Sequence, residues 1–469
     1  MVNGDTQTIA HVGYPTSIFK SPLVDNPRFV KQCVSAAVVP LGVKADGPAG
    51  FSPDADGRST IVCSTLRSLT HKTAYRLIDR FGGPKGGEGM NRPRFLAAGA
   101  LAAALSLNVA VALATDTVNI PCVCELSGAG AVAGTNFHDG AHLAVDEINA
   151  AGGILGKTIE MTDMDTQTDP MTSRALVQKA IDSGAYAIMG TIYSGSTIVN
   201  MMVAQKAGVP QFTGAEAPNI TQKHNPFIFR TSSGAEKGVP ALTSYFKDQL
   251  KARKIAISWV NNDFGKGGHD VFLAQMKKAG IEVVADVPSE EGQADFSADV
   301  SKIKQSGAQA VFVYLNEEED ARFLKEARKQ GLKATLVGEV TLTGQKVIDL
   351  AGGAAEGAIA HVGLATSAPI PSIENFVAKF KKHYGRDTDH NGIKGYIGVY
   401  AIKYATELNG KFDRKALADK LHGLTLDVAK YPNMLLTTSW DANGELSRES
   451  FITEVKDGKQ VVTGTVPAN

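Results

Sequence analysis

The stretch KIAISWVNNDFGKGGHDVFLAQMKKAGIEVVADV, residues 254–287, decides the fold class because it holds a strand, a helix and a second strand in order. Apolar runs rich in Ile and Val at 255–260 and 281–287 are typical of buried strands, and the residues between them predict a helix over 268–279. A helix that connects two strands of one sheet makes those strands parallel. This stretch therefore predicts a parallel sheet covered by helices.

The same alternation extends over both sides of this stretch. On the C-terminal side it continues through a helix at 300–305, a strand at 310–315 and a helix at 320–330. On the N-terminal side, helices alternate with predicted strands at 118–125, 158–163, 185–189 and 209–212. Two similar α/β lobes, Rossmann-like and each with a parallel sheet, are expected. After them the sequence predicts helices at 373–384 and 395–408 and a hairpin at 439–455, turned at Asn443 and Gly444.

An export signal is predicted well inside the chain, at MNRPRFLAAGALAAALSLNVAVALATD, residues 90–116. Two arginines near its start, an apolar run over 95–111 and the small-residue box ALA at 112–114 are the three parts of such a signal. The alternative is a buried core helix or a membrane span. Cleavage after the box places the expected mature start at Thr115, in the periplasm.

Residues 1–89 show no sustained periodicity of either a helix or a strand. Our hypothesis is that Met90 is the true initiator and that residues 1–89 are an over-extended, non-native N-terminus. The competing interpretation is a disordered or regulatory extension. The predicted organisation is therefore an N-terminal segment at 1–89, a signal peptide at 90–114 and two lobes from Thr115 onward.

The charge balance bears on the kind of partner. Without residues 1–114 the chain keeps 36 Lys and Arg against 41 Asp and Glu, a mildly acidic balance that argues against nucleic acid. Cys122 and Cys124 would lie on the same face of one strand, about 6.6 Å apart, where a disulfide fits poorly. They are interpreted as small apolar core residues.

Motifs for catalysis or cofactor binding fail on inspection. Gly128-Ala129-Gly130 with Gly134 follows a strand, but no helix opens inside the motif and no acidic residue closes a strand about 20 residues on, as nucleotide binding requires. The triplet at 263–265 copies a kinase motif without its catalytic loop. No nucleophile elbow, HExxH or paired Cys/His zinc spacing is present. We therefore expect no enzyme, no cofactor and no metal.

One turn does indicate a binding site. In GTIYSGSTIVNMM, residues 190–202, a strand ends and a helix begins at Ser194-Gly195-Ser196-Thr197. Backbone N–H groups, the positive end of the helix dipole and hydroxyls converge there, which suits a carboxylate or a similar anion. The alternative is an ordinary Ser/Thr helix cap.

The chain from Thr115 to Asn469 resembles the type I periplasmic solute-binding proteins of ABC importers, in the leucine/isoleucine/valine-binding branch. The resemblance rests on ELSGAGAVAG with GAHLAVDEINAAGGILGKTIE, on DTQTDP, GTIYSGST, VPQFTGAEAPNIT, IFRTSSG and NNDFGKGG, and on ADFSADVSKIKQSGAQAVFVY and EARKQGLKATLVG. It implies two lobes joined by crossing hinge strands near 231–234, 361–364 and 435–438. The first lobe would comprise 115–232 and 363–436, and the second 233–362 and 437–469.

The resemblance also implies a function. The lobes would close on a small solute, the closed shape would be read by an inner-membrane permease, and the protein would act as a monomer with no bond broken. Ser194 matches the serine that holds the ligand carboxylate, and Gly214 matches a residue whose carbonyl meets the ammonium. The implied ligand-binding residues are Ser194, Gly195, Gly214, Ala215, Glu216, Phe264, Asn316 and Glu339.

Several positions depart from the family pattern. Pocket tyrosines fall on Ala133, Phe264 and Asn316, a threonine falls on Glu216, and the ammonium-pairing acid falls on Val340, next to Glu339. A carboxylate in a dehydrated cleft needs a partner, so Glu216 favours a ligand ammonium, with Glu339 in support. We expect an amino acid, branched-chain or other. The alternatives are an aromatic or aliphatic carboxylate or amide, or a ligand-sensing domain.

Overall fold

The computed structural model describes residues 7–11, 36–40 and 116–468, and the chain divides into a unit at Met1–Val111 and a unit at Ala112–Asn469. In the first unit, β1 (Gln7–His11) and β2 (Ala36–Pro40) pair in parallel. The predicted signal peptide and the Met90 start lie outside the described residues. Among the described helices, none is both long and apolar enough to cross a membrane. All that follows concerns the second unit.

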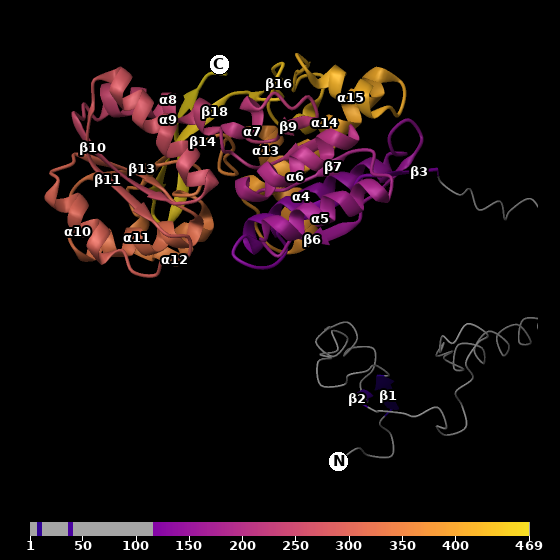
Figure 1. Ribbon diagram of the computed structural model, residues 1–469, viewed down its shortest axis with the longest axis horizontal. Helices are drawn as coiled ribbons and strands as arrows, with labels where there is room; N and C mark the ends of the chain where they lie inside the picture. Colours follow the sequence, from indigo (N-terminus) through magenta and orange to yellow (C-terminus); the bar gives the residue numbers. More distant parts are fainter. Residues whose placement is uncertain (1–6, 12–35, 41–115, 469) are drawn as a thin grey trace, which may run out of the picture. The chain divides into compact units, whose positions relative to one another are not determined.

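The first lobe is built on a parallel sheet in the order β6-β4-β7-β8-β9, of which Figure 1 labels β6, β7 and β9. Its strands are β4 (Cys122–Cys124), β6 (Asp163–Asp165), β7 (Ile188–Met189), β8 (Gln211–Thr213) and β9 (Ile228–Arg230). A parallel pair, β3 (Thr117–Asn119) and β5 (Thr158–Glu160), precedes β4 and β6. The helices between the strands are α4 (Ala131–Ala150), α5 (Pro170–Asp182), α6 (Ser194–Ala207) and the short α7 (Asn219–Gln222).

The second lobe has a seven-stranded sheet in the order β11-β10-β12-β13-β14-β18-β19. Five strands are parallel: β10 (Lys254–Val260), β11 (Glu282–Ser289), β12 (Ala310–Tyr314), β13 (Thr335–Gly338) and β14 (Ile359–Val362). The C-terminal strand β18 (Ser450–Lys456) is antiparallel to β14, and β19 (Lys459–Val466) is antiparallel to β18. Its helices are α8 (Ala235–Ser244), α9 (Asp263–Ala279), α10 (Ser297–Gln305), α11 (Glu317–Lys329) and α12 (Gln345–Ala351). The predicted class, two α/β lobes with parallel sheets, is confirmed.

Three further helices complete the first lobe: α13 (Pro371–Tyr384), α14 (His390–Asn409) and α15 (Arg414–Leu421). Helix α14 packs closely on α4, because Gly140 lies against the backbone of Gly392 and Gly395 lies against the backbone of Phe137. A Cβ at either Gly140 or Gly395 would come within 1.9 Å of a carbonyl oxygen of the other helix. This close approach fixes the position of α14, which contributes a side chain to the site described below.

The chain passes between the two sheets three times: after β9, after β14 and immediately before β18. Arg448 lies in the last passage and donates to the carbonyls of Thr231 and Gly363 in the other two, each at 3.2 Å. The last passage comes after the 435–438 stretch that the sequence analysis named. The reason is that β16 (Thr438–Trp440) stays with the first lobe, where the buried Trp440 Nε1 donates to the Arg230 carbonyl at 2.8 Å.

Several local expectations need correction. The strand expected at 158–163 is divided between β5 and β6, which lie in different sheets. Of the hairpin expected at 439–455, only β16 and β17 (Leu446–Ser447) pair, because β18 pairs with β14 in the second lobe. The strand expected at 118–125 is two strands, β3 and β4, separated at Pro121, which has no N–H to donate to a sheet. Cys122 and Cys124 are fully buried core residues as predicted, but the structure joins them by a disulfide, which the sequence analysis considered unfavourable. Their Cα atoms are 5.7 Å apart, closer than in an extended strand and inside the usual range for a disulfide.

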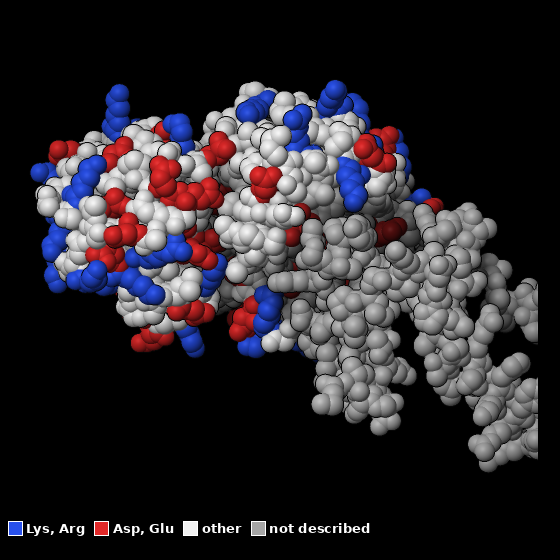
Figure 2. Space-filling view, turned by 60° about the horizontal axis from the view of Figure 1, so that its bottom comes forward, with Lys and Arg blue, Asp and Glu red and all other residues white. Residues whose placement is uncertain are grey.

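The surface carries charges of both signs. On the face shown in Figure 2, basic and acidic side chains are interspersed over the described residues.

Candidate functional site

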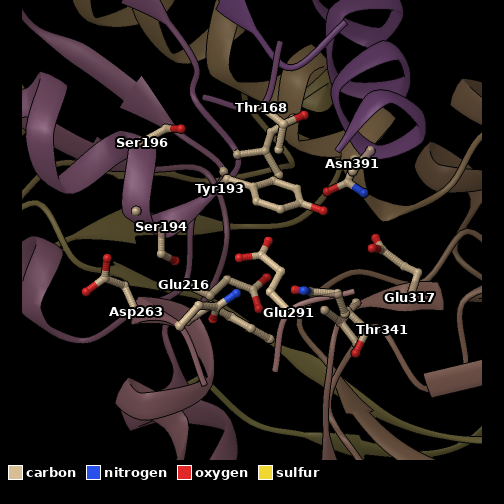
Figure 3. A pocket seen from close by; sticks show the side chains of 18 of the residues that line it. Thr168, Tyr193, Ser194, Ser196, Glu216, Asp263, Glu291, Glu317, Thr341 and Asn391 are labelled. Atoms are coloured by element: carbon tan, nitrogen blue, oxygen red, sulfur yellow. The ribbon is translucent and has the colours of Figure 1, made fainter. Parts of the chain in front are cut away.

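A cavity of about 210 Å³ is lined by residues of both lobes (Figure 3). The first lobe contributes the turn before α6 and the segment after β8, and the second contributes the loops after β10, β12 and β13. These loops all follow the carboxyl ends of parallel strands, where α/β sheets bind their ligands. Of the predicted site residues, the cavity is lined by Ser194, Gly195, Gly214, Glu216, Phe264 and Asn316.

The predicted anion seat is the N-terminus of α6. Ser194 is its first residue and is 3% exposed, and the first turn of a helix leaves N–H groups without intrahelical acceptors. The Ser194 hydroxyl oxygen accepts a hydrogen bond from the backbone N–H of Ala217 at 3.2 Å. That hydroxyl can still donate its own proton to an anion in the cavity. The arrangement therefore provides donors of the kind that a carboxylate needs.

The turn itself is held by a residue that the sequence analysis missed. The Glu125 carboxylate, directly after β4, accepts the N–H groups of Ile192 and Tyr193 at 3.1 and 3.2 Å. Burial raises the pKa of Glu125 to about 7, although these hydrogen bonds oppose the shift. The Tyr193 ring projects into the cavity (Figure 3). A buried acid at the end of the first apolar strand was the available sequence signal.

Glu216 has a charged partner within the protein, which changes the interpretation that it needs an ammonium group on the ligand. Lys394 Nζ on α14 lies 2.8 Å from the Glu216 carboxylate and 3.3 Å from the Gly214 carbonyl. The side chains of Lys394 and Glu216 are only 5% and 14% exposed. The Glu216 charge is therefore balanced within the protein and does not by itself demand a cation on the ligand. No local sequence pattern points to this pair, because Lys394 lies 178 residues away from Glu216.

Glu339 and Ala215 do not line the cavity. The Glu339 carboxylate lies 2.9 Å from His361 Nδ1, and His361 Nε2 lies 2.9 Å from the Ser450 hydroxyl, so Glu339 belongs to a buried cluster near the passages between lobes. Burial raises the pKa of Glu339, and His361 opposes that shift. Val340, its neighbour, is the residue that lines the cavity. The idea that Glu339 reinforces Glu216 at the cavity surface is therefore not supported by this arrangement.

The second-lobe wall combines an aromatic surface with acids. Phe264 stacks on Tyr314, with ring centroids 4.3 Å apart, and Asn316 is the N-cap residue of α11. Asp263, Glu291 and Glu317 also line the cavity (Figure 3).

The charges in the cavity wall do not balance. Lys394 is the one Lys or Arg in the wall as far as the described residues show, and Glu216, Asp263, Glu291 and Glu317 are the acids there. His390 does not add a charge, because burial and then the neighbouring Lys394 hold its pKa well below its ordinary value. After Lys394 pairs with Glu216, the wall keeps an excess of acidic groups, which favours a cationic group on a bound molecule.

The chain is similar to several known proteins. The leucine-, isoleucine-, valine-, threonine- and alanine-binding protein of Pseudomonas aeruginosa is 28% identical over 331 residues, covering 70% of this chain and 88% of the relative. The branched-chain amino acid transporter substrate binding protein LivJ of Streptococcus pneumoniae, solved with isoleucine, is 25% identical with a TM-score of 0.68, covering 76% and 99%. A solute binding protein of an ABC transporter from Rhodopseudomonas palustris, solved with p-hydroxybenzoic acid, is 24% identical with a TM-score of 0.69, covering 76% and 98%.

Residues 117–460 match the sequence profile of the family described as periplasmic binding protein. That match spans both lobes and all three passages between them. The chain therefore belongs to the periplasmic binding protein family.

Proposed function

We propose that this protein captures a small amino acid, a branched-chain one first, between its lobes and delivers it to the permease of an ABC importer. The observation that carries the proposal is the cavity that both lobes line, whose wall holds the N-terminus of α6 and an excess of acidic side chains. Curated relatives named for binding leucine, isoleucine and valine support it.

Each end of an amino acid has suitable partners in this cavity. The carboxylate fits Ser194 and the first N–H groups of α6, and the ammonium fits the second-lobe acids Glu291 and Glu317. An aliphatic side chain fits Phe264 and Val340. Binding groups on both lobes gain their full contacts only when the lobes close, so closure is coupled to ligand binding. No bond of the solute is broken in this cycle.

An aromatic carboxylate is the second candidate. The structural neighbour from Rhodopseudomonas palustris holds p-hydroxybenzoic acid, and the rings of Tyr193 and Phe264 line the cavity here. Such an acid has no ammonium, so it would leave the excess acidic groups of the second lobe without a cationic partner. This difference separates the two candidates experimentally.

The test compares leucine with 4-methylpentanoate, which lacks only the amino group, and with p-hydroxybenzoate, in thermal-shift and calorimetric titrations. A ligand at 100 times its Kd stabilises the native state by about 2.7 kcal/mol, which is readily measured. We expect binding of leucine, isoleucine or valine and at least tenfold weaker binding of 4-methylpentanoate. Equal affinity for 4-methylpentanoate, or binding of p-hydroxybenzoate alone, would replace the amino acid by a carboxylate.

Export and the oligomeric state belong to the same proposal. The protein acts as a monomer in the periplasm, and its mature form begins at Thr115. Mass spectrometry of periplasmic extracts should find Thr115 at the N-terminus, and light scattering should give the mass of one chain. A periplasmic protein that retains residues 1–89 would contradict this account.

A further inference from the structure

A cluster of two histidines and one aspartate lies outside the solute cavity. His138 and His142 are one turn apart on α4, and Asp163 is the first residue of β6. The Nε2 atoms of His138 and His142 lie 3.1 and 2.7 Å from the same Asp163 oxygen. The three donor atoms lie within 4.8 Å of one another, so one ion can contact all of them. None of the three residues lines the cavity.

We propose that His138, His142 and Asp163 bind a divalent transition-metal ion, with Zn²⁺ as the best match. Two imidazoles and one carboxylate are ligands that Zn²⁺ takes readily, and three protein ligands leave a fourth position for water. The side chains of His138, His142 and Asp163 are 19%, 26% and 42% exposed, so an ion and its water can enter from solvent.

The separations of the donor atoms suit such an ion. Ligands that lie about 2.0–2.1 Å from Zn²⁺ at tetrahedral angles are roughly 3.3 Å apart. The separations of His138 Nε2 and His142 Nε2 from the Asp163 oxygen, 3.1 and 2.7 Å, need to open by only a few tenths of an ångström. Small rotations of half-exposed side chains provide that movement without any shift of α4 or β6.

A second layer of contacts orients one ligand. The Asp139 carboxylate lies 2.8 Å from His138 Nδ1, and the Arg386 guanidinium pairs with the other Asp139 oxygen. A carboxylate on Nδ1 keeps the proton there and leaves the Nε2 lone pair for a metal, as is usual around protein metal ligands. Two surface histidines that only hydrogen-bond to Asp163 would not need a further carboxylate on His138 Nδ1.

The alternative is a purely hydrogen-bonded cluster in which Asp163 accepts from both imidazoles. The two interpretations differ in one measurable property, the response to a metal ion. A bound ion would tie α4 to β6 and so raise the melting temperature, whether or not a solute is present. The hydrogen-bonded cluster alone predicts no such rise.

The experiment titrates metal-stripped protein, without any histidine tag, with Zn²⁺ by calorimetry, and with Co²⁺ by absorption spectroscopy. We expect one saturable site and a rise in melting temperature. His142→Ala and Asp163→Asn should each weaken Zn²⁺ binding more than tenfold. Asp139→Asn should weaken it about 10- to 100-fold, because the carboxylate that orients His138 is lost.

The matched control is His224→Ala, which removes a surface histidine bonded to Asn443 and should leave Zn²⁺ binding unchanged. Circular dichroism and leucine titration show whether each variant is folded and able to bind solute. No saturable binding in the wild type, or equal binding in wild type and His142→Ala, would overturn the proposal. Because the test reads metal affinity, its result is separate from that of the solute test.

Discussion

Replacing Lys394 by methionine tests the buried ion pair in the cavity wall. The substitution keeps the length of the side chain and removes its charge, which leaves the Glu216 carboxylate 14% exposed and without its cation. Breaking one partner of a buried pair costs about 3–5 kcal/mol. The carboxylate can avoid a buried charge by taking up a proton, which costs an ordinary glutamate about 3.7 kcal/mol at pH 7. That cost is the upper limit of the loss in stability. We therefore expect a loss of about 3 kcal/mol at pH 7.

The same reasoning predicts a dependence on pH. The cost of protonating a carboxyl group falls by about 1.4 kcal/mol per pH unit, so the loss in Lys394→Met should shrink to about 1 kcal/mol at pH 5. For the unit Ala112–Asn469, an unfolding entropy of about 2.1 cal/mol/K per residue converts 3 kcal/mol into a melting temperature lower by about 4 °C. Urea unfolding at pH 5 and pH 7, followed by circular dichroism, measures both values.

Two controls isolate the pair. In the double variant Lys394→Met with Glu216→Gln, neither member of the pair leaves an unpartnered charge, so part of the lost stability should return; the rest reflects the buried Arg448, which the Glu216 charge also stabilises. Lys382→Met removes an exposed lysine from α13 and should change stability by less than about 0.5 kcal/mol. A loss below about 1 kcal/mol in Lys394→Met, equal at pH 5 and pH 7, would refute the argument that this pair balances a buried charge.

Three more predictions follow from the site. Ser194→Ala should weaken solute binding about 10- to 100-fold in calorimetric titrations, because a charge-assisted hydrogen bond to the solute is lost. Unchanged affinity would mean that the Ser194 hydroxyl only accepts the Ala217 N–H and does not bind the solute. Because folding raises the pKa of Glu125 to about 7, the contribution of this group to stability should fall by roughly 3 kcal/mol as the pH rises from 4.5 to 7. Glu125→Gln should remove this part of the slope in urea unfolding, whereas the part from other buried acids such as Glu236 remains. A slope equal to that of the wild type would contradict the assignment. Saturation with solute should reduce the radius of gyration in small-angle scattering, and no change would argue against lobe closure.

The order of strands and helices could be predicted from the sequence, because that signal is local. The helix expected over 373–384 is α13 (Pro371–Tyr384), and Asp169 caps α5 at Pro170 through the Thr172 N–H at 2.6 Å. Some helices begin earlier than the apolar periodicity predicts. Helix α9 begins at Asp263 because Asn262 accepts the N–H of Gly265, a cap that precedes the apolar periodicity.

The candidate site could be predicted only where it depends on one segment. The turn at Ser194 combines a strand end, small hydroxyl residues and a helix start within a few residues, and the structure places it in the cavity wall. Glu216 and Phe264 also lie there, as expected from the resemblance. Glu339 was expected in the cavity wall, but its neighbour Val340 lies there. Neighbouring side chains point in different directions where a strand passes into a loop, so an error of one position changes which residue faces the cavity.

By itself, the sequence determined the fold class, the two lobes and the helix N-terminus that lines the cavity, because hydrophobic periodicity and capping act over a few residues. Only the tertiary structure decided which charges neutralise one another. Lys394 reaches Glu216 because the glycines of α4 and α14 let two distant helices touch. Arg448 joins passages that lie far apart in the chain, and Asp163 meets two histidines of another element. Such pairings depend on packing between segments distant in sequence, which no local pattern encodes.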